Sequence, residues 1–407
     1  MTAAALASPL SHAEPEALQS LPPLSLYIHI PWCVKKCPYC DFNSHEIRGG
    51  RDNLPEAEYV AALTRDLETA LPSIWGRRVA SVFFGGGTPS VFSARSIEAL
   101  LAAARMLLPL EPGAEVTLEA NPGTFEAKKF ADFRSAGVNR LSIGIQSFDS
   151  RHLRALGRVH DGNEARRAVD IALDNFDNVN LDLMYALPHQ TLEDARRDVG
   201  AAASHGVAHI SAYHLTLEPN TLFYRQPPPL PDDDTAAQMQ ATVEQALHQH
   251  GYLNYEVSAF ARPGRESRHN MNYWLFGDYL GIGAGAHSKI SLADRIVRQV
   301  RFRQPRQYLA RALDASPQAT PIMAQHEVDG TDRGFEFMMN ALRLTRGFEA
   351  KIFTARTGLQ LESLVSQLDE AQRRGLITRD GEHIAPTPLG RRFLNDLLQI
   401  FLPEQQE

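Results

Sequence analysis

The sequence is poor in cysteine and has no long hydrophobic run. Only three cysteines occur in 407 residues, too few for the disulfide framework of a secreted domain. No apolar stretch approaches the roughly 18 residues that span a bilayer. Residues 1–23 also lack the basic start and apolar core of a secretory signal. These absences predict a soluble, cytoplasmic protein that begins with a mobile tail over residues 1–23.

The chain also lacks an excess of basic residues. The chain has 48 acidic residues against 41 Lys and Arg, and its net charge is −7, which argues against nucleic-acid binding through a basic face. Apolar residues make up 43% and charged residues 22% of the chain, as in globular proteins and not in disordered or coiled-coil chains. The length suits one large domain with a smaller second unit.

Strand-like and helix-like segments alternate between residues 24 and 225. We expect strands at 25–30, 79–84, 115–120, 140–148, 178–187 and 209–217. Helices are expected between them at 58–71, 93–108, 125–135, 163–173 and 192–204. Parallel strands need such crossover helices. We therefore predict an α/β fold with a partial (β/α)6 barrel, whose active site lies at the C-terminal ends of its strands.

The chain changes character after residue 225. Prolines and aspartates at 226–234 predict a stiff connector, and we treat 226–317 as an extension of the barrel with a helix at 235–250, a strand at 254–260 and a loop at 268–274. Within 318–407 we expect helices near 331–344, 348–356 and 360–374, a hairpin around Asp380-Gly381 and a final helix after Pro388. This pattern predicts a winged-helix-like C-terminal domain. The acidic charge balance favours packing or a lid role over DNA binding.

All three cysteines lie in one short stretch after the first predicted strand. Cys33, Cys37 and Cys40 have the spacing C-x3-C-x2-C, and three thiolates on one loop can ligate three irons of a [4Fe–4S] cluster. The fourth iron is then left for an external chelator, and S-adenosylmethionine offers an amine and a carboxylate for it. The alternative is a zinc site whose fourth ligand is His29, Asp41 or His45.

Residues 25–44, SLYIHIPWCVKKCPYCDFNS, resemble the cluster loop of radical S-adenosylmethionine proteins. Later segments resemble blocks of the oxygen-independent coproporphyrinogen III oxidase branch and its HemW-type haem chaperone relatives. In chain order they are FFGGGTPS, EANPGT, RLSIGIQSFD, LGRVHD, NLDLMYALPHQT and HNMNYWLFGDYLGIGAGAHS. The resemblance extends from about residue 24 to residue 400. It implies a [4Fe–4S] cluster on the three cysteines and S-adenosylmethionine beside it.

The same resemblance assigns a set of residues to the adenosyl cofactor. Glycines let the backbone approach a ligand closely, and a carboxylate at a strand end can pair with an ammonium or ribose hydroxyl groups. The implied contacts are Tyr27, Gly86, Glu119, Gln146, Arg158 and Asp182, with Gly87 and Thr88 facing the place of a second S-adenosylmethionine molecule. The alternatives are a tight turn at the glycines, and polar groups that merely close a barrel end at Gln146 and Asp182.

Two departures from the oxidase pattern favour the chaperone branch. The oxidases have a further cysteine two positions after the third ligand, where this chain has Phe42, and only some 23 residues precede the first predicted strand. The segment 269–274 also matches the HNxxYW pattern of the chaperones. Its His269 and Tyr273 would share one face of a helix, and either side chain can ligate haem iron. The alternative is that this segment only packs against the barrel.

We therefore expect a haem chaperone that binds haem, a [4Fe–4S] cluster and S-adenosylmethionine. It would pass haem to apo-proteins such as respiratory cytochromes, at a membrane-bound acceptor, which implies a peripheral membrane contact. Radical decarboxylation of coproporphyrinogen III is the alternative activity. A third hypothesis is a zinc-stabilised barrel with neither activity. A homodimer is compatible with the sequence, and no nucleic-acid partner is expected. The glycine-rich run at 281–285 lacks the spacing of a dinucleotide fingerprint.

Overall fold

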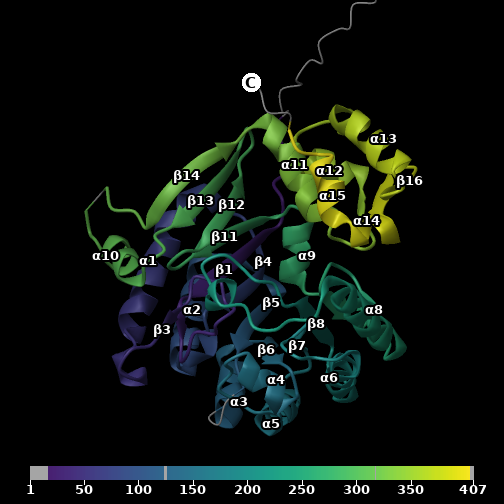
Figure 1. Cartoon of the computed structure of the whole chain (residues 1–407). Coiled ribbons are helices and arrows are strands. Elements are labelled where there is room, and N and C mark those ends of the chain that lie inside the picture. The colour runs from purple at the N-terminus through teal and green to yellow at the C-terminus, as the bar shows by residue number, and fades with distance from the viewer. Residues whose placement is uncertain (1–16, 123–125, 317, 404–407) are drawn as a thin grey trace, which may run out of the picture.

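The computed structural model describes residues 17–122, 126–316 and 318–403. Its largest feature is a 12-stranded mixed sheet in the order β14-β13-β12-β11-β1-β4-β5-β6-β7-β8-β10-β9 (Figure 1). Six neighbouring strands run parallel in chain order: β1 (Leu24–Ile30), β4 (Val79–Gly86), β5 (Leu110–Ala120), β6 (Arg140–Gln146), β7 (Val179–Tyr185) and β8 (His209–His214). This order confirms the predicted partial (β/α)6 barrel.

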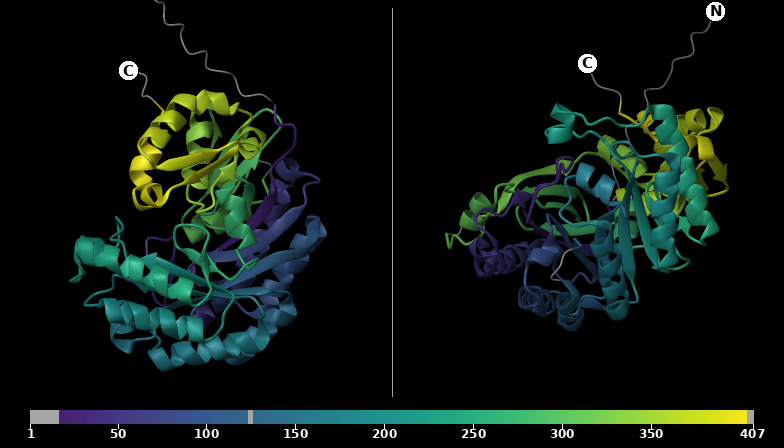
Figure 2. Two further views of the ribbon diagram at one scale, coloured as in Figure 1. Left: turned by 90° about the vertical axis from the view of Figure 1, so that its right-hand side faces the viewer. Right: turned by 60° about the horizontal axis from the view of Figure 1, so that its bottom comes forward.

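Helices form the outer layer of the barrel, as Figure 2 shows. The connections between parallel strands carry α1 (Glu56–Ile74), α2 (Ala94–Leu107), α3 (Glu126–Ala136), α4 (Ser150–Ala155), α5 (Gly162–Asn175) and α6 (Leu192–Ser204), and α8 (Asp233–Gln249) lies beside α6. Two of these helices begin with capping boxes, Asp161 with Glu164 and Thr191 with Asp194. The apolar faces of helices and strands together form the main hydrophobic core.

The barrel extension contains more strands than the sequence predicted. Beyond β1 the sheet continues with β11 (Asp278–Ile282), β12 (His287–Ser291), β13 (Ile296–Arg301) and β14 (Ile322–Val328), of which β11 alone is parallel to its inner neighbour. Helix α10 (Pro305–Ala312) lies in the connection from β13 to β14. A short α7 (Leu222–Arg225) follows β8.

Two local expectations in this region were wrong. The single strand at 254–260 is divided into β9 (Leu253–Asn254) and β10 (Ala259–Ala261), because the Asn254 amide donates to the carbonyl groups of Glu256 and Ala259 and closes a turn between them. The expected loop at 268–274 is helix α9 (Arg268–Trp274), whose N-terminus is capped by the hydroxyl of Ser267.

The C-terminal unit has its own small sheet and hydrophobic core, and Figure 1 shows it in yellow beside α11. The sheet has the order β15-β17-β16, with β15 (Phe348–Glu349), the predicted hairpin strands β16 (Ile377–Asp380) and β17 (His383–Pro386), and helices α11 (Gly330–Ala341), α12 (Ala350–Thr357), α13 (Val365–Arg373), α14 (Pro388–Arg392) and α15 (Leu394–Gln399) around it. The expected final helix is interrupted at Phe393. Since β14 pairs with β13 in the large sheet, we place the start of this unit at Asp329 and not at residue 318.

The predicted tail at residues 1–23 falls mostly outside the described residues. Within them, the Leu18 N–H donates to the Ala293 carbonyl group. The helices of the described part of the chain include none with the length and hydropathy of a membrane span.

Candidate functional site

The three cysteines lie on the loop that follows β1 at the C-terminal rim of the barrel. Cys33 ends the short strand β2 (Trp32–Cys33), which pairs with β3 (His45–Glu46) and so returns the loop to the barrel. Each sulfur has a polar neighbour at hydrogen-bond distance: Thr88 Oγ1 donates to Cys33 (3.5 Å), a guanidinium nitrogen of Arg158 donates to Cys37 (3.6 Å), and Ser44 Oγ lies 3.5 Å from Cys40. Such neighbours stabilise thiolates.

Burial raises the pKa of the Cys33 thiol to about 11. At neutral pH this sulfur is therefore protonated unless a metal displaces the proton. The described residues include one group of three His, Cys, Asp or Glu ligand atoms within 4.8 Å of one another, and the cysteines are not part of it. A single zinc ion would hold its sulfur ligands about 3.8 Å apart. The three sulfurs do not all lie within 4.8 Å of one another, which favours an iron–sulfur cluster over zinc.

The candidate fourth zinc ligand His29 has both ring nitrogens engaged. Its Nδ1 lies 3.0 Å from the Tyr27 hydroxyl oxygen and its Nε2 lies 2.9 Å from the Asn43 carbonyl oxygen. Burial also lowers the pKa of His29 to about 4. His29 therefore connects β1 with the end of the cysteine loop, and neither of its ring nitrogens is free to bind zinc.

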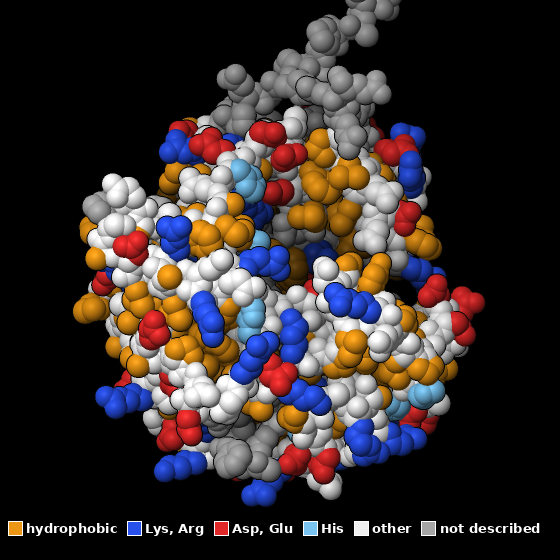
Figure 3. Space-filling model, turned by 60° about the vertical axis from the view of Figure 1, so that its left-hand side comes forward, with side chains coloured by type: hydrophobic (Ala, Val, Ile, Leu, Met, Phe, Trp, Pro, Cys, Tyr) orange, Lys and Arg blue, Asp and Glu red, His pale blue; other side chains and the backbone are white. Residues whose placement is uncertain are grey.

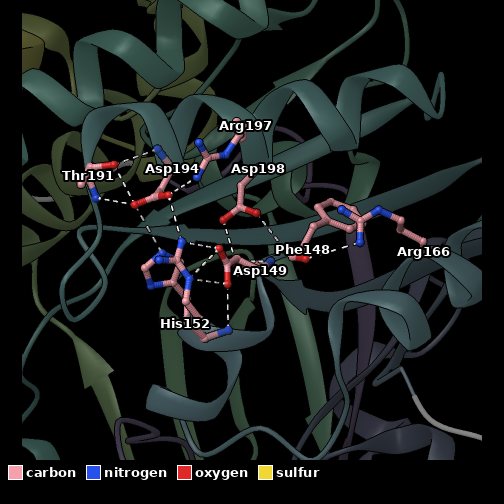
Figure 4. A network of polar contacts seen from close by, with 10 residues as sticks. Phe148, Asp149, His152, Arg166, Thr191, Asp194, Arg197 and Asp198 are labelled. Atoms are coloured by element: carbon pink, nitrogen blue, oxygen red, sulfur yellow. Dashed lines mark hydrogen bonds and ion pairs between the residues drawn. The ribbon is translucent and has the colours of Figure 1, made fainter.

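Asp149, His152 and Asp194 make up the compact group of ligand atoms mentioned above (Figure 4). Asp149 caps α4 and pairs with Arg151 at 2.7 Å, and this contact holds the pKa of Asp149 at about 2. Asp194 accepts hydrogen bonds from Thr191 and pairs with Arg151 and Arg197. Because arginines neutralise both carboxylates, we interpret this group as a network that fixes helix starts at the rim.

A cavity of about 320 Å³ opens beside the cysteines, and we call it the cysteine cavity. Ten of the predicted site residues line it: Cys33, Cys37, Cys40, Gly86, Gly87, Thr88, Glu119, Gln146, Arg158 and Asp182. They come from five successive parts of the chain and meet because parallel strands end at a common rim. Sequence reasoning missed further lining residues, among them Tyr39, Asn121, Met184 and Tyr213.

Gly86 and Gly87 bring the β4 backbone too close to its neighbours for any side chain. Gly86 has a φ of +117°, and a Cβ atom there would lie 2.6 Å from the His29 ring. A Cβ atom on Gly87 would lie 2.6 Å from the Trp32 carbonyl oxygen. The glycine segment is therefore a tight turn and also a part of the cavity wall.

Two carboxylates, on β5 and β7, line the cysteine cavity. Burial and the nearby Asp182 raise the pKa of Glu119 to about 8, although Glu119 accepts the Gly86 N–H at 3.2 Å. Burial likewise raises the pKa of Asp182, which accepts hydrogen bonds from Asn180 (2.9 Å) and Ser142 (3.2 Å). A cationic ligand would stabilise the ionised forms of both groups, so this donor set suits an ammonium or sulfonium group.

Gln146 and Arg158 are held firmly at the same rim. Gln146, at the end of β6, has a φ of +66°, a strained conformation that often occurs at functional positions. The Arg158 guanidinium group donates to the Gly144 carbonyl (2.7 Å) and to the Asn121 side chain (2.8 Å), besides Cys37. Arg158 is therefore not a solvated surface arginine and fixes the cysteine loop against β6.

A second cavity of about 430 Å³ adjoins the first, and we call it the aromatic cavity. Phe42, Gly86 and Glu119 line both cavities. Seven of the residues that line the aromatic cavity carry rings: Tyr27, His29, Phe42, His269, Tyr273, Tyr279 and His287. The space-filling view shows a hollow in the upper half of one face, with histidine and Lys or Arg side chains beside it (Figure 3).

Three predicted site residues line the aromatic cavity and not the cysteine cavity, namely Tyr27, His269 and Tyr273. Tyr27 was expected next to the adenosyl cofactor and lines the aromatic cavity instead of the cysteine cavity. Sequence reasoning missed Tyr279 and Arg303, which also line this cavity. Tyr279 lies on β11 and Arg303 follows β13, and the antiparallel strand β12 joins these two strands in the sheet.

Helix α9 brings His269 into the aromatic cavity. Its Nδ1 lies 3.2 Å from Ser81 Oγ, and its ring lies against Phe83 with a centroid distance of 4.8 Å. Burial lowers the pKa of His269 to about 3, so its imidazole is neutral at physiological pH. Its Nε2 has no hydrogen-bond partner among the residues that the structure describes, and a neutral Nε2 is a good ligand for haem iron.

Of the other residues in the 269–274 segment, one lines the aromatic cavity and others pack against the protein. Tyr273 is 37% exposed and stacks on Tyr279 with a centroid distance of 5.0 Å. Trp274 does not line the aromatic cavity, and its ring is covered by the Arg343 guanidinium group at 4.7 Å. Met271 packs against the small apolar cluster around Tyr255. The segment thus offers His269 and Tyr273, not Trp274, to a ligand.

Known proteins have similar sequences and a similar fold. Residues 27–200 match the radical SAM superfamily and residues 328–393 match the HemN C-terminal domain. The chain is 47% identical to "Heme chaperone HemW" of Escherichia coli over 94% of this chain and 99% of that protein, and 34% identical to its Bacillus subtilis counterpart over 93% and 99%. In fold it resembles the radical SAM enzyme coproporphyrinogen III oxidase (HemN) of Escherichia coli, with a TM-score of 0.78, 24% identity and coverage of 94% and 90%.

Proposed function

The chain belongs to the HemW family within the radical SAM superfamily, and from this premise we propose that it binds haem in the aromatic cavity and delivers it to apo-haemoproteins. The observation that carries the proposal is the ring-lined aromatic cavity next to a cavity lined by three cysteines. Its His269 Nε2 has no hydrogen-bond partner among the described residues. A flat porphyrin gains most from contact with aromatic side chains. We further propose that the acceptors are apo-cytochromes at a membrane, reached from the cytoplasm.

The cysteine cavity would hold a [4Fe–4S] cluster on Cys33, Cys37 and Cys40, with S-adenosylmethionine beside it. When bound, this pair supplies one-electron chemistry. The residues of the chain would bind and orient it. Glu119 and Asp182 would take the ammonium and ribose hydroxyl groups, and the Gly86 and Gly87 backbone would line the methionyl end. Phe42, Gly86 and Glu119 line both cavities, so the two proposed ligands would lie close together.

In the aromatic cavity, His269 Nε2 is the proposed axial ligand of the haem iron. Tyr27, Phe42 and Tyr279 would contact the porphyrin faces, and Tyr273 would contact the ring or the iron from the same helix as His269. Phe42 is 64% exposed, and a large exposed aromatic side chain at a cavity mouth favours an apolar ligand.

A titration with haem tests the proposal. Cluster-reconstituted protein, kept anaerobic, is expected to bind haem with a shifted Soret band and to transfer it to an apo-cytochrome. Parallel samples receive coproporphyrinogen III, S-adenosylmethionine and a reductant. Protoporphyrin formed over many turnovers would establish the alternative, an oxidase, and no haem binding would refute the chaperone function.

We expect S-adenosylmethionine binding to depend on pH through Glu119. With a pKa of about 8 in the empty cavity, Glu119 is mostly protonated at pH 7. A cationic ligand favours the carboxylate, so binding at pH 7 should release up to about one proton and become tighter as the pH rises toward 8. Calorimetry in two buffers of different ionisation enthalpy measures this proton release.

Glu119→Gln serves as the control for this prediction. The variant should bind S-adenosylmethionine about tenfold more weakly at pH 8 and should lose the part of the proton release that Glu119 contributes. Its iron content should equal that of the wild type. Proton release that is identical in both proteins would contradict the assignment of Glu119 to the cationic part of the cofactor.

A further inference from the structure

Arg303 is the only Lys or Arg among the residues that line the aromatic cavity, and it lies exposed between β13 and α10. We propose that Arg303 binds a carboxylate of the ligand in this cavity, which under the proposed function is a haem propionate. The inference rests on that function and adds the group that recognises the acidic edge of the porphyrin.

The charge of Arg303 is not neutralised by any of the described residues. Among the described residues no carboxylate forms an ion pair with Arg303, whereas the nearby Arg298 pairs with Glu336 (2.6 Å) and Arg301 pairs with Asp66 (3.2 Å). An arginine that lines a cavity without a counter-ion is suited to bind a carboxylate in a bidentate manner.

The other ionisable groups of the cavity do not oppose this charge. Glu119 is the only Asp or Glu in the lining, and its pKa of about 8 keeps it mostly neutral at pH 7. Burial lowers the pKa of His29, His269 and His287, in the last case with a contribution from Arg303 itself. The lining thus carries about one positive charge at neutral pH, and an anionic ligand balances it.

The position of Arg303 is fixed by the loop that carries the cysteines. The Asn43 side-chain amide donates to the carbonyl oxygens of Arg303 and Ala284, each at 2.9 Å, while the Asn43 carbonyl oxygen lies 2.9 Å from His29 Nε2. The contact is tight, because a Cβ atom on Gly285 would lie 2.3 Å from the Asn43 amide nitrogen. Asn43 lies three residues after Cys40. It therefore holds the backbone at the rim of the aromatic cavity in place against the cysteine loop.

Two ligands could supply the carboxylate: haem through its propionates, or a second S-adenosylmethionine through its methionyl group. The aromatic lining favours haem, because a porphyrin buries its flat rings against Tyr27, Phe42 and Tyr279 while its propionates remain at the rim. A methionyl group would leave most of these rings without contact.

The test compares haem with haem dimethyl ester, whose propionates are blocked. Arg303→Ala should bind haem about tenfold more weakly than the wild type and should bind the dimethyl ester with unchanged affinity. Arg303→Lys should recover part of the loss. Arg306→Ala, which removes another exposed arginine from the adjacent helix α10, is the matched control and should behave as the wild type.

The following outcomes would overturn the inference that Arg303 binds a haem propionate. Equal affinities of Arg303→Ala and wild type for haem, or an equal loss for haem and the ester, would exclude a propionate contact. A lower stoichiometry of bound S-adenosylmethionine with unchanged haem affinity would assign the arginine to that carboxylate instead. If the wild type fails to bind haem, the proposed function falls and this inference with it, whereas normal haem binding with no effect of Arg303→Ala refutes the inference alone.

Discussion

Replacement of Cys37 by alanine should abolish reconstitution of an intact [4Fe–4S] cluster and the tight binding of S-adenosylmethionine. The loop offers three sulfur ligands and the sequence contains no other cysteine, so two ligands would remain for four irons. The expected result is a loss of most of the bound iron and acid-labile sulfide, measured per mole of protein after anaerobic reconstitution. Cys37 is only half-buried, so thermal unfolding of the metal-free variant should stay close to that of the metal-free wild type.

Asp41→Ala is the matched control, since Asp41 is exposed and belongs to the same loop. It should retain full iron and sulfide content, because the cluster needs no carboxylate from the chain. A stoichiometric zinc ion in the wild type that is lost in Asp41→Ala, with no sulfide in either protein, would contradict the cluster. Haem binding should survive in Cys37→Ala, because Cys37 does not line the aromatic cavity.

The six parallel strands could be predicted because each is a short β-rich run between turn residues. In β1 the apolar Leu24, Leu26, Ile28 and Ile30 alternate with Ser25, Tyr27 and His29, and all but Tyr27 are buried. The strands β13 and β14 could not be predicted, since IVRQVR carries two arginines and IMAQHEV is largely exposed at the edge of the sheet. Edge strands lack the apolar pattern that sequence reasoning depends on.

The cysteine cavity could be predicted because its strands were predicted to be parallel. Once the strands are parallel, the residues at their C-terminal ends must meet, and motif positions as distant as Cys33 and Asp182 line one space. The aromatic cavity could be predicted only in part, because it also needs α9 and the turn after β11. Tyr279 reaches it because β11 pairs with the distant β1, and Arg303 reaches it because it follows β13, which is joined to β11 through β12. Composition and spacing do not reveal these pairings.

His269→Ala should weaken haem binding by at least about tenfold and leave the cluster intact. The variant removes the α9 imidazole that lines the aromatic cavity and whose Nε2 has no hydrogen-bond partner in the described part of the chain. An axial ligand contributes much of the affinity for haem. Soret titration gives the dissociation constant, and the iron and sulfide content checks the cluster. Tyr273→Phe is the matched variant, since it keeps the ring and removes the other candidate ligand atom.

Binding of iron-free protoporphyrin shows whether His269 acts by ligating the iron or only by packing. If His269 acts through the metal, the variant and the wild type should bind iron-free protoporphyrin with equal affinity, whereas a purely structural role would weaken both porphyrins alike. The pH dependence gives a second check. Because burial lowers the pKa of His269 to about 3, the imidazole stays neutral down to pH 5, and haem affinity should not fall between pH 8 and pH 5 through this residue. An ordinary histidine with a pKa near 6.5 would lose most of its ligand form across that range, so a steep loss near pH 6.5 would place the haem ligand elsewhere.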